Sequence, residues 1–345
     1  MDAPLQFKPL FREYIWGARR LGEVLGKPIG TAPRYAESWE IVDHGDEQSI
    51  VESGTYQGKT LAQLMQLDPQ GLLGAQAVAE GRALAADGKS VGFPLLLKYL
   101  DCDRVLSVQV HPDDAYGRRM SPPDLGKTEA WYIMSAEPES VIYAGLQAGV
   151  GPKELRNACD AGRVDDVLHT LRPRAGDCVF IPAGTVHALG SGLLVAEIQQ
   201  ASNTTFRLFD WNRVDDNGNP RPLHVEQAID VTNFDRGPVA FQSPEPLPDA
   251  TTSRESSSTR GTGERLVGCD QFVLNRYQGG GSWRVGGNDR FQIITIVGGS
   301  ARLIWQEDRE LKLSLGQTVL LPAAMQPATL MADDPQSTLL VMHLP

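Results

Sequence analysis

The segment from Ser107 to Pro112 carries the first residues whose types and spacing could do chemistry. In a β-strand, residues i and i+2 point to the same side, so Ser107, Gln109 and His111 share one face. The valines between them share the other face. Polar groups that face the interior of a β-barrel are costly to bury unless they are paired. A metal or polar ligand bound on that face would explain the pattern.

Two further segments could supply groups to the same centre. Lys127 and Glu129 are also two residues apart on an expected strand, so they share a face. The stretch from Gly176 to His187 reads G-x5-P-x-G-x2-H without a gap. Glycine allows a tight turn and proline ends strand pairing, so the turn that follows should bring His187 back over the sheet. Two imidazoles and a carboxylate on like-facing strands indicate a metal site.

The stretch that ends at His187 resembles the second conserved motif of the cupin superfamily. Four other segments narrow this resemblance, and they occur in the right order: AESWEI near residue 40, QVHP, KTEAWY, and TTFRLFDW. Together the five look like the short form of type I mannose-6-phosphate isomerases, with a good match over residues 5–235 and a looser one beyond. The resemblance implies a zinc-dependent isomerase that interconverts mannose 6-phosphate and fructose 6-phosphate through an enediol. Its partner would be a small-molecule sugar phosphate.

By this resemblance, the ligands of one zinc ion per chain map onto Gln109, His111, Glu129 and His187. The residue types agree with that assignment. Two imidazoles, one carboxylate and one amide oxygen leave room on the ion for water or substrate, as a catalytic zinc site requires.

The resemblance points to Lys98, Lys127 and Arg207 for the remaining catalytic roles. Lys98 lies within the apolar run FPLLLKYL, where it either extends out of a strand end or faces the metal as the base that shuttles the proton. Lys127 should face the same cavity as Glu129. The planar guanidinium of Arg207 suits a phosphate or an enediolate oxygen. Ser107 could donate a hydrogen bond to the phosphate.

The sequence departs from the family pattern four residues before the arginine. Many relatives carry an acid there, whereas this chain has Asn203. An asparagine can hydrogen-bond to Arg207 or to a substrate hydroxyl, but it cannot be a carboxylate base. Glu197, in AEIQQ, is another carboxylate near the expected site, with either a substrate-binding or a structural role.

Two other functions share part of this pattern. One is another metal-dependent cupin enzyme, such as an iron dioxygenase that uses two histidines and a carboxylate. The other is a cupin that binds a sugar phosphate without turning it over, which Asn203 keeps open. Gln109 as a fourth ligand, with Lys127 and Arg207 as cations, favours the isomerase. Metal analysis discriminates, because zinc has no redox chemistry.

The elements that must position these residues are mostly strands. The chain has 35 glycines and 23 prolines, spread between short apolar runs, which indicates many turns and strands. We therefore expect a mainly β fold of two cupin-type (jelly-roll) β-barrels with short inserted helices. The helices are predicted within residues 60–74 and 152–171, where apolar residues recur at helical spacing.

An internal repeat supports two similar halves. Residues 314–327 repeat the pattern of residues 174–187, with Gly316 and Pro322 in place of Gly176 and Pro182, but Pro327 stands where the first copy has His187. The second copy therefore keeps the scaffold and lacks the ligand. We expect a catalytic cupin domain with the metal site over residues 1–240, a linker rich in Ser, Thr and Pro over 241–263, and a C-terminal cupin-like domain without metal ligands over 264–345.

Composition excludes several classes of partner. The formal net charge is −11, and no cluster of Lys and Arg is visible, so nucleic acid and anionic membranes are poor partners. The longest apolar runs are too short to span a bilayer. The first residues show no signal-peptide pattern, and the four cysteines show no disulfide-like spacing. We expect reduced cysteines and a cytoplasmic protein.

Overall fold

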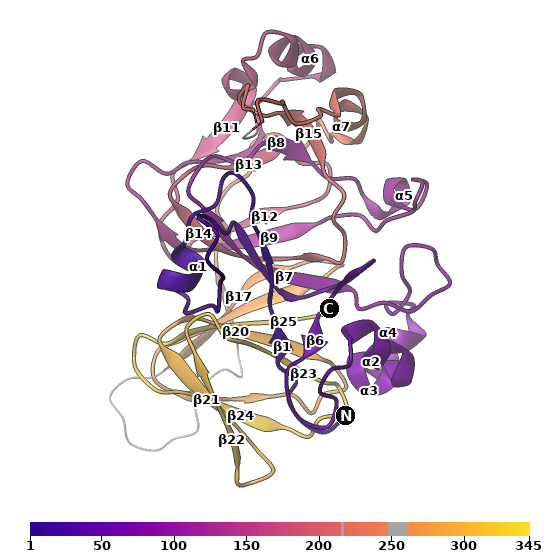
Figure 1. Cartoon of the computed structure of the whole chain (residues 1–345), viewed down its shortest axis with the longest axis vertical. Coiled ribbons are helices and arrows are strands. Elements are labelled where there is room, and N and C mark those ends of the chain that lie inside the picture. The colour runs from indigo at the N-terminus through magenta and orange to yellow at the C-terminus, as the bar shows by residue number, and fades with distance from the viewer. Residues whose placement is uncertain (215–216, 248–260) are drawn as a thin grey trace.

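The structure is a computed structural model that describes residues 1–214, 217–247 and 261–345, and it consists largely of antiparallel sheets (Figure 1). The first half contains a five-stranded sheet in the order β11-β10-β13-β8-β15 and a six-stranded sheet in the order β12-β9-β14-β7-β3-β2. The five-stranded sheet consists of β8 (Val108–Val110), β10 (Ile142–Leu146), β11 (Leu168–Leu171), β13 (His187–Leu189) and β15 (Phe206–Phe209). The six-stranded sheet consists of β2 (Leu10–Arg12), β3 (Glu37–Ile41), β7 (Leu95–Cys102), β9 (Glu129–Ala136), β12 (Cys178–Ile181) and β14 (Leu193–Gln200).

The C-terminal half repeats this plan with a second pair of sheets, in the orders β16-β17-β18-β25-β20-β23 and β19-β24-β21-β22. The larger sheet consists of β16 (Glu245–Pro246), β17 (Thr262–Gly268), β18 (Val273–Gln278), β20 (Gln292–Gly298), β23 (Thr318–Leu321) and β25 (Thr338–His343). The smaller sheet consists of β19 (Ser282–Val285), β21 (Ser300–Trp305), β22 (Arg309–Ser314) and β24 (Ala328–Ala332).

Short helices and small hairpins are inserted between these strands. The two-stranded pairs are β1 (Phe7–Lys8) with β6 (Ile50–Val51), and β4 (Asp43–His44) with β5 (Glu47–Gln48). The helices are α1 (Arg20–Glu23), α2 (Leu61–Leu67), α3 (Pro69–Leu73), α4 (Ala75–Ala79), α5 (Asp114–Gly117), α6 (Pro152–Asp160), α7 (Val225–Val231) and the 3-10 helix η1 (Val164–Val167). The prediction of a mainly β fold with short inserted helices is confirmed. No helix among the residues described above is both long and apolar enough to cross a membrane.

Each half buries its core between its two sheets. In the first half, Trp131 and Val195 of the six-stranded sheet pack in one cluster with Ala144 and Leu189 of the five-stranded sheet. Because side chains alternate along each strand, the residues of these strands that face the other sheet line the interior of the half. The site residues must therefore come from these inward faces.

The repeat predicted from glycine and proline spacing is present in both halves. Gly176 (φ 94°) and Gly316 (φ 83°) have left-handed backbone conformations, which glycine adopts without strain. Each precedes a four-residue strand, β12 or β23, and Pro182 or Pro322 follows directly. The two segments therefore form the same turn and strand in each half.

The predicted helix over residues 152–171 is present only in part, as α6 and the short 3-10 helix η1, and is wrong over residues 168–171. Helix α6 ends at Asp160, Gly162 follows with a positive φ of 65°, and residues 168–171 form strand β11. The apolar residues at helical spacing therefore continue through a glycine turn into a strand. The predicted helix over 60–74 is present as two helices, because Pro69 begins a new helix capped by Asp68.

The two halves share one continuous apolar core. Phe93 and Phe291 lie 4.8 Å apart between ring centroids, and the hydroxyl of Tyr99 contacts Thr295 of β20. Helices α2, α3 and α4 come from the N-terminal region but lie beside the C-terminal half (Figure 1). Asp289 accepts hydrogen bonds from the first backbone N–H groups of α4 there. The second half thus packs against strand β7 of the first.

Residues 248–260 of the expected linker lie outside the described residues, and the division into domains stays a prediction. Two residues of that linker, Glu245 and Pro246, form strand β16 and pair with β17.

Candidate functional site

One row of the five-stranded sheet carries three of the expected site residues. Gln109 of β8 pairs directly with His187 of β13 on one side and with Arg207 of β15 on the other. Directly opposed residues of antiparallel strands point to the same face, so the three side chains form one row. The Ser107 hydroxyl donates to Gln109 Oε1 over 3.3 Å, as expected from the i, i+2 spacing.

A second row crosses the six-stranded sheet. Glu197 of β14 pairs with Trp131 of β9 and with Lys98 of β7, and Lys98 pairs with Trp39 of β3. The indole N–H of Trp131 donates to Glu197 Oε2 over 3.0 Å. Lys98 Nζ lies 4.5 Å from the ring centroid of Trp39, within cation–π range. Lys98 is buried and faces the site, so it does not extend out to solvent.

His111, Glu129 and His187 come together between these rows. Their ligand atoms all lie within 4.8 Å of one another. Glu129 Oε1 lies 3.3 Å from His187 Nε2, and Glu129 Oε2 lies 3.6 Å from His111 Nε2. The amide nitrogen of Gln109 lies 3.3 Å from His187 Nε2. The four residues assigned as ligands are therefore neighbours in space.

Backbone carbonyls orient both imidazoles. His111 Nδ1 donates to Thr204 O over 2.9 Å, and His187 Nδ1 donates to Thr185 O over 2.8 Å. With the proton on Nδ1, each Nε2 is left with its lone pair directed at the carboxylate, as in many metal sites. Burial lowers the pKa of His187 to about 4 and that of His111 well below its usual value. Both rings are therefore neutral near pH 7, the form that binds metals.

The Glu129 carboxylate indicates what the cluster can hold. The side chain is fully buried, and its Oε1 accepts no hydrogen bond from any described residue. Burial raises its pKa to about 7, although Lys127 opposes this rise. Lys127 Nζ lies 2.6 Å from Glu129 Oε2 and 3.2 Å from His111 Nε2, so a cation already occupies the space next to the ligand atoms. Two imidazole nitrogens and a buried carboxylate fit a divalent transition metal.

A line of alternating charges connects this triad with the rest of the site. It runs from Glu37 through Lys98, Glu197 and Lys127 to Glu129, with nitrogen-to-oxygen distances of 3.6, 3.8, 3.8 and 2.6 Å. We call these five residues the buried charge cluster. Burial alone would raise the pKa of Glu197, but Lys127 and Lys98 lower it below its usual value. Glu197 is therefore ionised at neutral pH.

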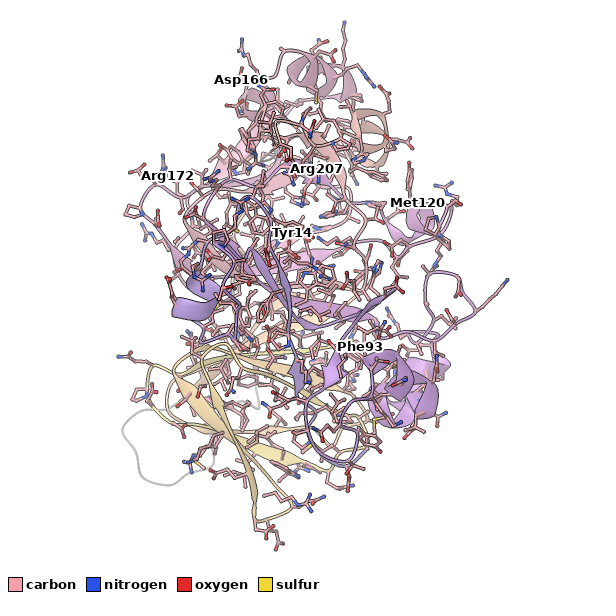
Figure 2. The ribbon with its side chains drawn as sticks, in the orientation of Figure 1. Tyr14, Phe93, Met120, Asp166, Arg172 and Arg207 are labelled. Atoms are coloured by element: carbon pink, nitrogen blue, oxygen red, sulfur yellow. The ribbon has the colours of Figure 1, made fainter. Side chains whose placement is uncertain are left out.

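A cavity of about 300 Å³ opens beside the cluster. Its walls include seven of the residues expected from the sequence: Lys98, Ser107, Gln109, Lys127, Glu197, Asn203 and Arg207. Figure 2 labels two of its lining residues, Tyr14 and Arg207, in the upper half of the molecule. The structure thus brings the expected metal ligands and the expected substrate residues together.

Arg207 is held at the rim of the cavity with part of its guanidinium available. Its Nη1 donates to Pro222 O over 2.9 Å, whereas its buried Nε has no hydrogen-bond partner among the described residues. Burial and the nearby Arg221 lower the pKa of Arg207. A bound anion would supply a negative charge next to the guanidinium and a hydrogen-bond acceptor for the Arg207 Nε.

Sequence reasoning missed seven residues of the cavity wall, among them Tyr14, Trp16, Glu37 and Arg221. Glu37 and Trp39 alternate on strand β3 within AESWEI, so the same i, i+2 argument could have placed Glu37 at the site. Arg221 bonds Asp210 through Nε at 2.7 Å and reaches the cavity from an irregular segment. No periodic signal marks such a position.

The fold and the site together define a cupin-type protein in which two histidines and a glutamate form a candidate metal centre beside a polar cavity. Residues 5–141 match the family model described as "Phosphomannose isomerase type I, catalytic domain".

Similar proteins agree over most of the chain. The mannose-6-phosphate isomerase ManA of Bacillus subtilis is 34% identical over 301 residues, which is 87% of each protein. The mannose-6-phosphate isomerase of Streptococcus mutans is 35% identical over 303 residues, 88% of this chain and 87% of that one. The crystal structure of the mannose 6-phosphate isomerase from Bacillus subtilis superposes with a TM-score of 0.82 at 30% identity, covering 99% of this chain and 100% of that one. The chain therefore belongs to the type I phosphomannose isomerases, an enzyme family, and the resemblance inferred from the motifs is confirmed.

Proposed function

We propose that this enzyme interconverts mannose 6-phosphate and fructose 6-phosphate in the 300 Å³ cavity, with one zinc ion bound at the adjoining triad. The observation that carries the proposal is the buried triad of His111, Glu129 and His187 at a cavity with cationic residues in its wall. The relatives of this protein in Bacillus subtilis and Streptococcus mutans are named mannose-6-phosphate isomerases, which supports mannose 6-phosphate as the substrate.

We propose that Gln109, His111, Glu129 and His187 hold the zinc ion. A bound zinc ion would supply Lewis acidity, stabilising the negative charge that builds on a sugar oxygen during enolisation. The Thr204 and Thr185 carbonyls keep both imidazoles in the tautomer that such binding needs.

The substrate would be anchored by polar groups at the cavity wall. Arg207 suits the phosphate, since its Nε has no partner among the described residues and its planar fork binds anions through paired hydrogen bonds. Ser107 could hydrogen-bond a phosphate oxygen by turning its hydroxyl away from Gln109 Oε1. Asn203 lines the same cavity and can hydrogen-bond to a sugar hydroxyl, but it cannot accept a proton as a carboxylate would.

The reaction moves one proton from C2 to C1 of the aldose through an enediol, while a second proton moves from O2 to O1. We propose Lys98 Nζ as the group that carries the carbon-bound proton, because Lys98 is buried and lines the cavity. As a neutral amine it would take the proton from C2, and the ammonium group so formed would return that proton to C1. Glu197 lies 3.8 Å from both Lys98 and Lys127, so its negative charge stabilises that transient ammonium group as well as the ammonium group of Lys127. Lys127 in turn contacts Glu129 and would stabilise charge next to the reacting oxygens.

We also propose that residues 1–240 form the catalytic domain, that 241–263 link it to the rest, and that 264–345 brace it. The presence of Pro327 at the position of His187 supports one metal site in the first domain.

The test combines metal analysis with an assay of mannose 6-phosphate conversion before and after chelation. We expect about one zinc per chain, loss of activity with the metal, and recovery when zinc is added back. His111→Ala and Glu129→Ala should lose both zinc and activity. Bound zinc without turnover of any sugar phosphate would refute the isomerase, and iron with oxygen consumption would favour a dioxygenase.

A further inference from the structure

The short turn between strands β14 and β15 is fixed by a carboxylate from a distant part of the chain. Asp124 Oδ2 accepts hydrogen bonds from the hydroxyls of Ser202 (3.0 Å) and Thr204 (2.6 Å), and a longer one from Asn203 N (3.4 Å). All three donors belong to consecutive residues of the turn. Asp124 follows α5, which Figure 1 shows at the side of the first half. One carboxylate oxygen therefore contacts three consecutive residues of the turn, which Gln199 Nε2 also holds through Ser202 O.

The same turn contacts the candidate metal centre in two ways. The Thr204 carbonyl accepts the Nδ1 proton of His111 over 2.9 Å, and Asn203 lines the substrate cavity. Thr204 thus bonds Asp124 through its hydroxyl and His111 through its carbonyl. Only two hydrogen bonds separate the Asp124 carboxylate from a metal-ligating imidazole.

Asp124 is itself held in place. Its Oδ1 accepts from Leu125 N over 2.8 Å and lies 3.2 Å from His44 Nε2 of strand β4. Burial would raise the pKa of Asp124, but the hydrogen bonds from His44 and Thr204 lower it below its usual value, so the carboxylate is ionised. An ionised acceptor makes stronger hydrogen bonds than a neutral one. The turn is therefore attached to a rigid anchor.

We propose that Asp124 is a positioning residue: through Thr204 it fixes the tautomer and direction of His111, and through Asn203 it shapes the cavity wall. The proposal rests on the proposed function only in taking His111 as a metal ligand. Asp124 touches neither the metal ligands nor the expected substrate. Partners of this kind typically change metal affinity or activity by about 10- to 100-fold when they are lost.

Thr204 offers a matched pair of variants. Thr204→Val removes the hydroxyl bond to Asp124 and keeps the backbone carbonyl, whereas Thr204→Ser keeps both groups. Asp124→Ala removes the anchor itself. Asp87→Ala is the control, because Asp87 holds another turn in the same manner, through Lys89 N and the Ser90 hydroxyl. That turn has no hydrogen bond to a ligand of the triad among the described residues.

Two measurements distinguish positioning from general stability. The first is the imidazole tautomer of His111 in the metal-free protein, read from long-range proton–nitrogen NMR spectra. The second is the dissociation constant of zinc, measured by competition with a chelator. We expect wild type, Thr204→Ser and Asp87→Ala to show the Nδ1–H form and tight zinc binding. Asp124→Ala and Thr204→Val should show a mixture of tautomers and a zinc dissociation constant raised about 10- to 100-fold.

The inference is overturned if Thr204→Val leaves both the tautomer and the zinc affinity at wild-type values. Because Thr204→Val removes only one hydroxyl, it tests the positioning role of Asp124 even where Asp124→Ala fails to fold. The tautomer and zinc measurements do not depend on turnover. If they change as expected and wild type converts no sugar phosphate, the proposed function fails and the positioning role stands. If wild type is active and neither quantity responds to Thr204→Val, the positioning role fails alone.

Discussion

Replacing Glu129 with glutamine should make the metal-free protein more stable above neutral pH, although it removes a metal ligand. Glu129 is completely buried, and burial raises its pKa from 4.5 to about 7 even with Lys127 beside it. The unfolded chain ionises this carboxyl near 4.5. Between these two values the folded protein binds more protons than the unfolded one, so its stability falls as pH rises.

The magnitude follows from the difference between the two pKa values. The shift from 4.5 to about 7 is about 2.5 units, and each unit corresponds to about 1.4 kcal/mol. The ionised carboxylate therefore costs the metal-free protein at most about 3.5 kcal/mol above pH 7. Glutamine has nearly the same shape and no charge. We expect the free energy of unfolding of metal-free Glu129→Gln to exceed that of wild type by up to this amount at alkaline pH. Near pH 4.5 the two values should differ little.

Urea unfolding with a chelator present, at several pH values, measures the free energy of unfolding of both proteins. Adding zinc should make wild type the more stable of the two proteins, since a ligand at about 1,000 times its dissociation constant stabilises by about 4.1 kcal/mol. Glu139→Gln is the control, because its side chain is 93% exposed and its removal should change little. A metal-free Glu129→Gln that is less stable than wild type at alkaline pH would refute the reasoning. So would a stability difference independent of pH.

Three further predictions concern other residues of the site. Arg207→Lys should lower kcat/KM for mannose 6-phosphate about 10- to 100-fold and leave bound zinc unchanged, because lysine cannot reproduce the paired hydrogen bonds of the guanidinium; a change in zinc content would argue against an anion-binding role. Lys98→Met should lower kcat at least about 100-fold and stop the incorporation of solvent deuterium at C1 of the product; continued incorporation would identify a different base. The hydrogen bond to Asp124 raises the pKa of His44, so His44→Gln should destabilise the protein below pH 6.5, with the difference lost as pH rises through that raised pKa; urea unfolding with a difference that grows at alkaline pH would contradict this sign.

The candidate ligands could be predicted because they obey local rules. Gln109 and His111 alternate on one strand, as do Lys127 and Glu129, and the turn before His187 needs glycine and proline at fixed positions. Alternation along a strand decides which side chains face the interior, and each of these pairs was found from it. The same rule would have found Glu37, which lies two residues before Trp39 on the same face of β3.

The supporting contacts could not be predicted, because they join segments that are far apart in sequence. Asp124 and His44 meet across 80 residues, and Arg221 bonds Asp210 from an irregular stretch. Neither contact has a period or a characteristic spacing. The helix predicted over residues 168–171 was wrong for a related reason, since the apolar spacing is similar before and after Gly162 although the backbone changes direction there. Local patterns specify which face is buried, whereas these contacts depend on how the sheets pack.

The charge balance of the site leads to a final prediction about the order of binding. With Glu129 ionised, the buried charge cluster has three carboxylates and two ammonium groups, a sum of −1. Arg207 in the cavity wall brings the sum to zero, and Arg221 of the same wall is paired with Asp210. The metal-free cavity therefore offers no net attraction to a phosphate of about −2 charge. A divalent cation raises the sum to +2, which matches such an anion.

We therefore expect fructose 6-phosphate to bind the zinc-loaded protein at least about tenfold more tightly than the metal-free protein, because charge interactions strengthen away from water. Isothermal titration calorimetry on both forms measures this ratio. Fructose, which carries no phosphate, is the control, and its affinity should gain less from zinc than that of the phosphate ester. If the affinity for fructose rises as much on addition of zinc, the metal contributes through the sugar oxygens alone. Charge balance would then not determine whether the metal must bind before the phosphate ester. If metal-free protein binds fructose 6-phosphate as tightly as the loaded form, Arg207 and its neighbours suffice for the anion, and the cluster does not couple the two binding events.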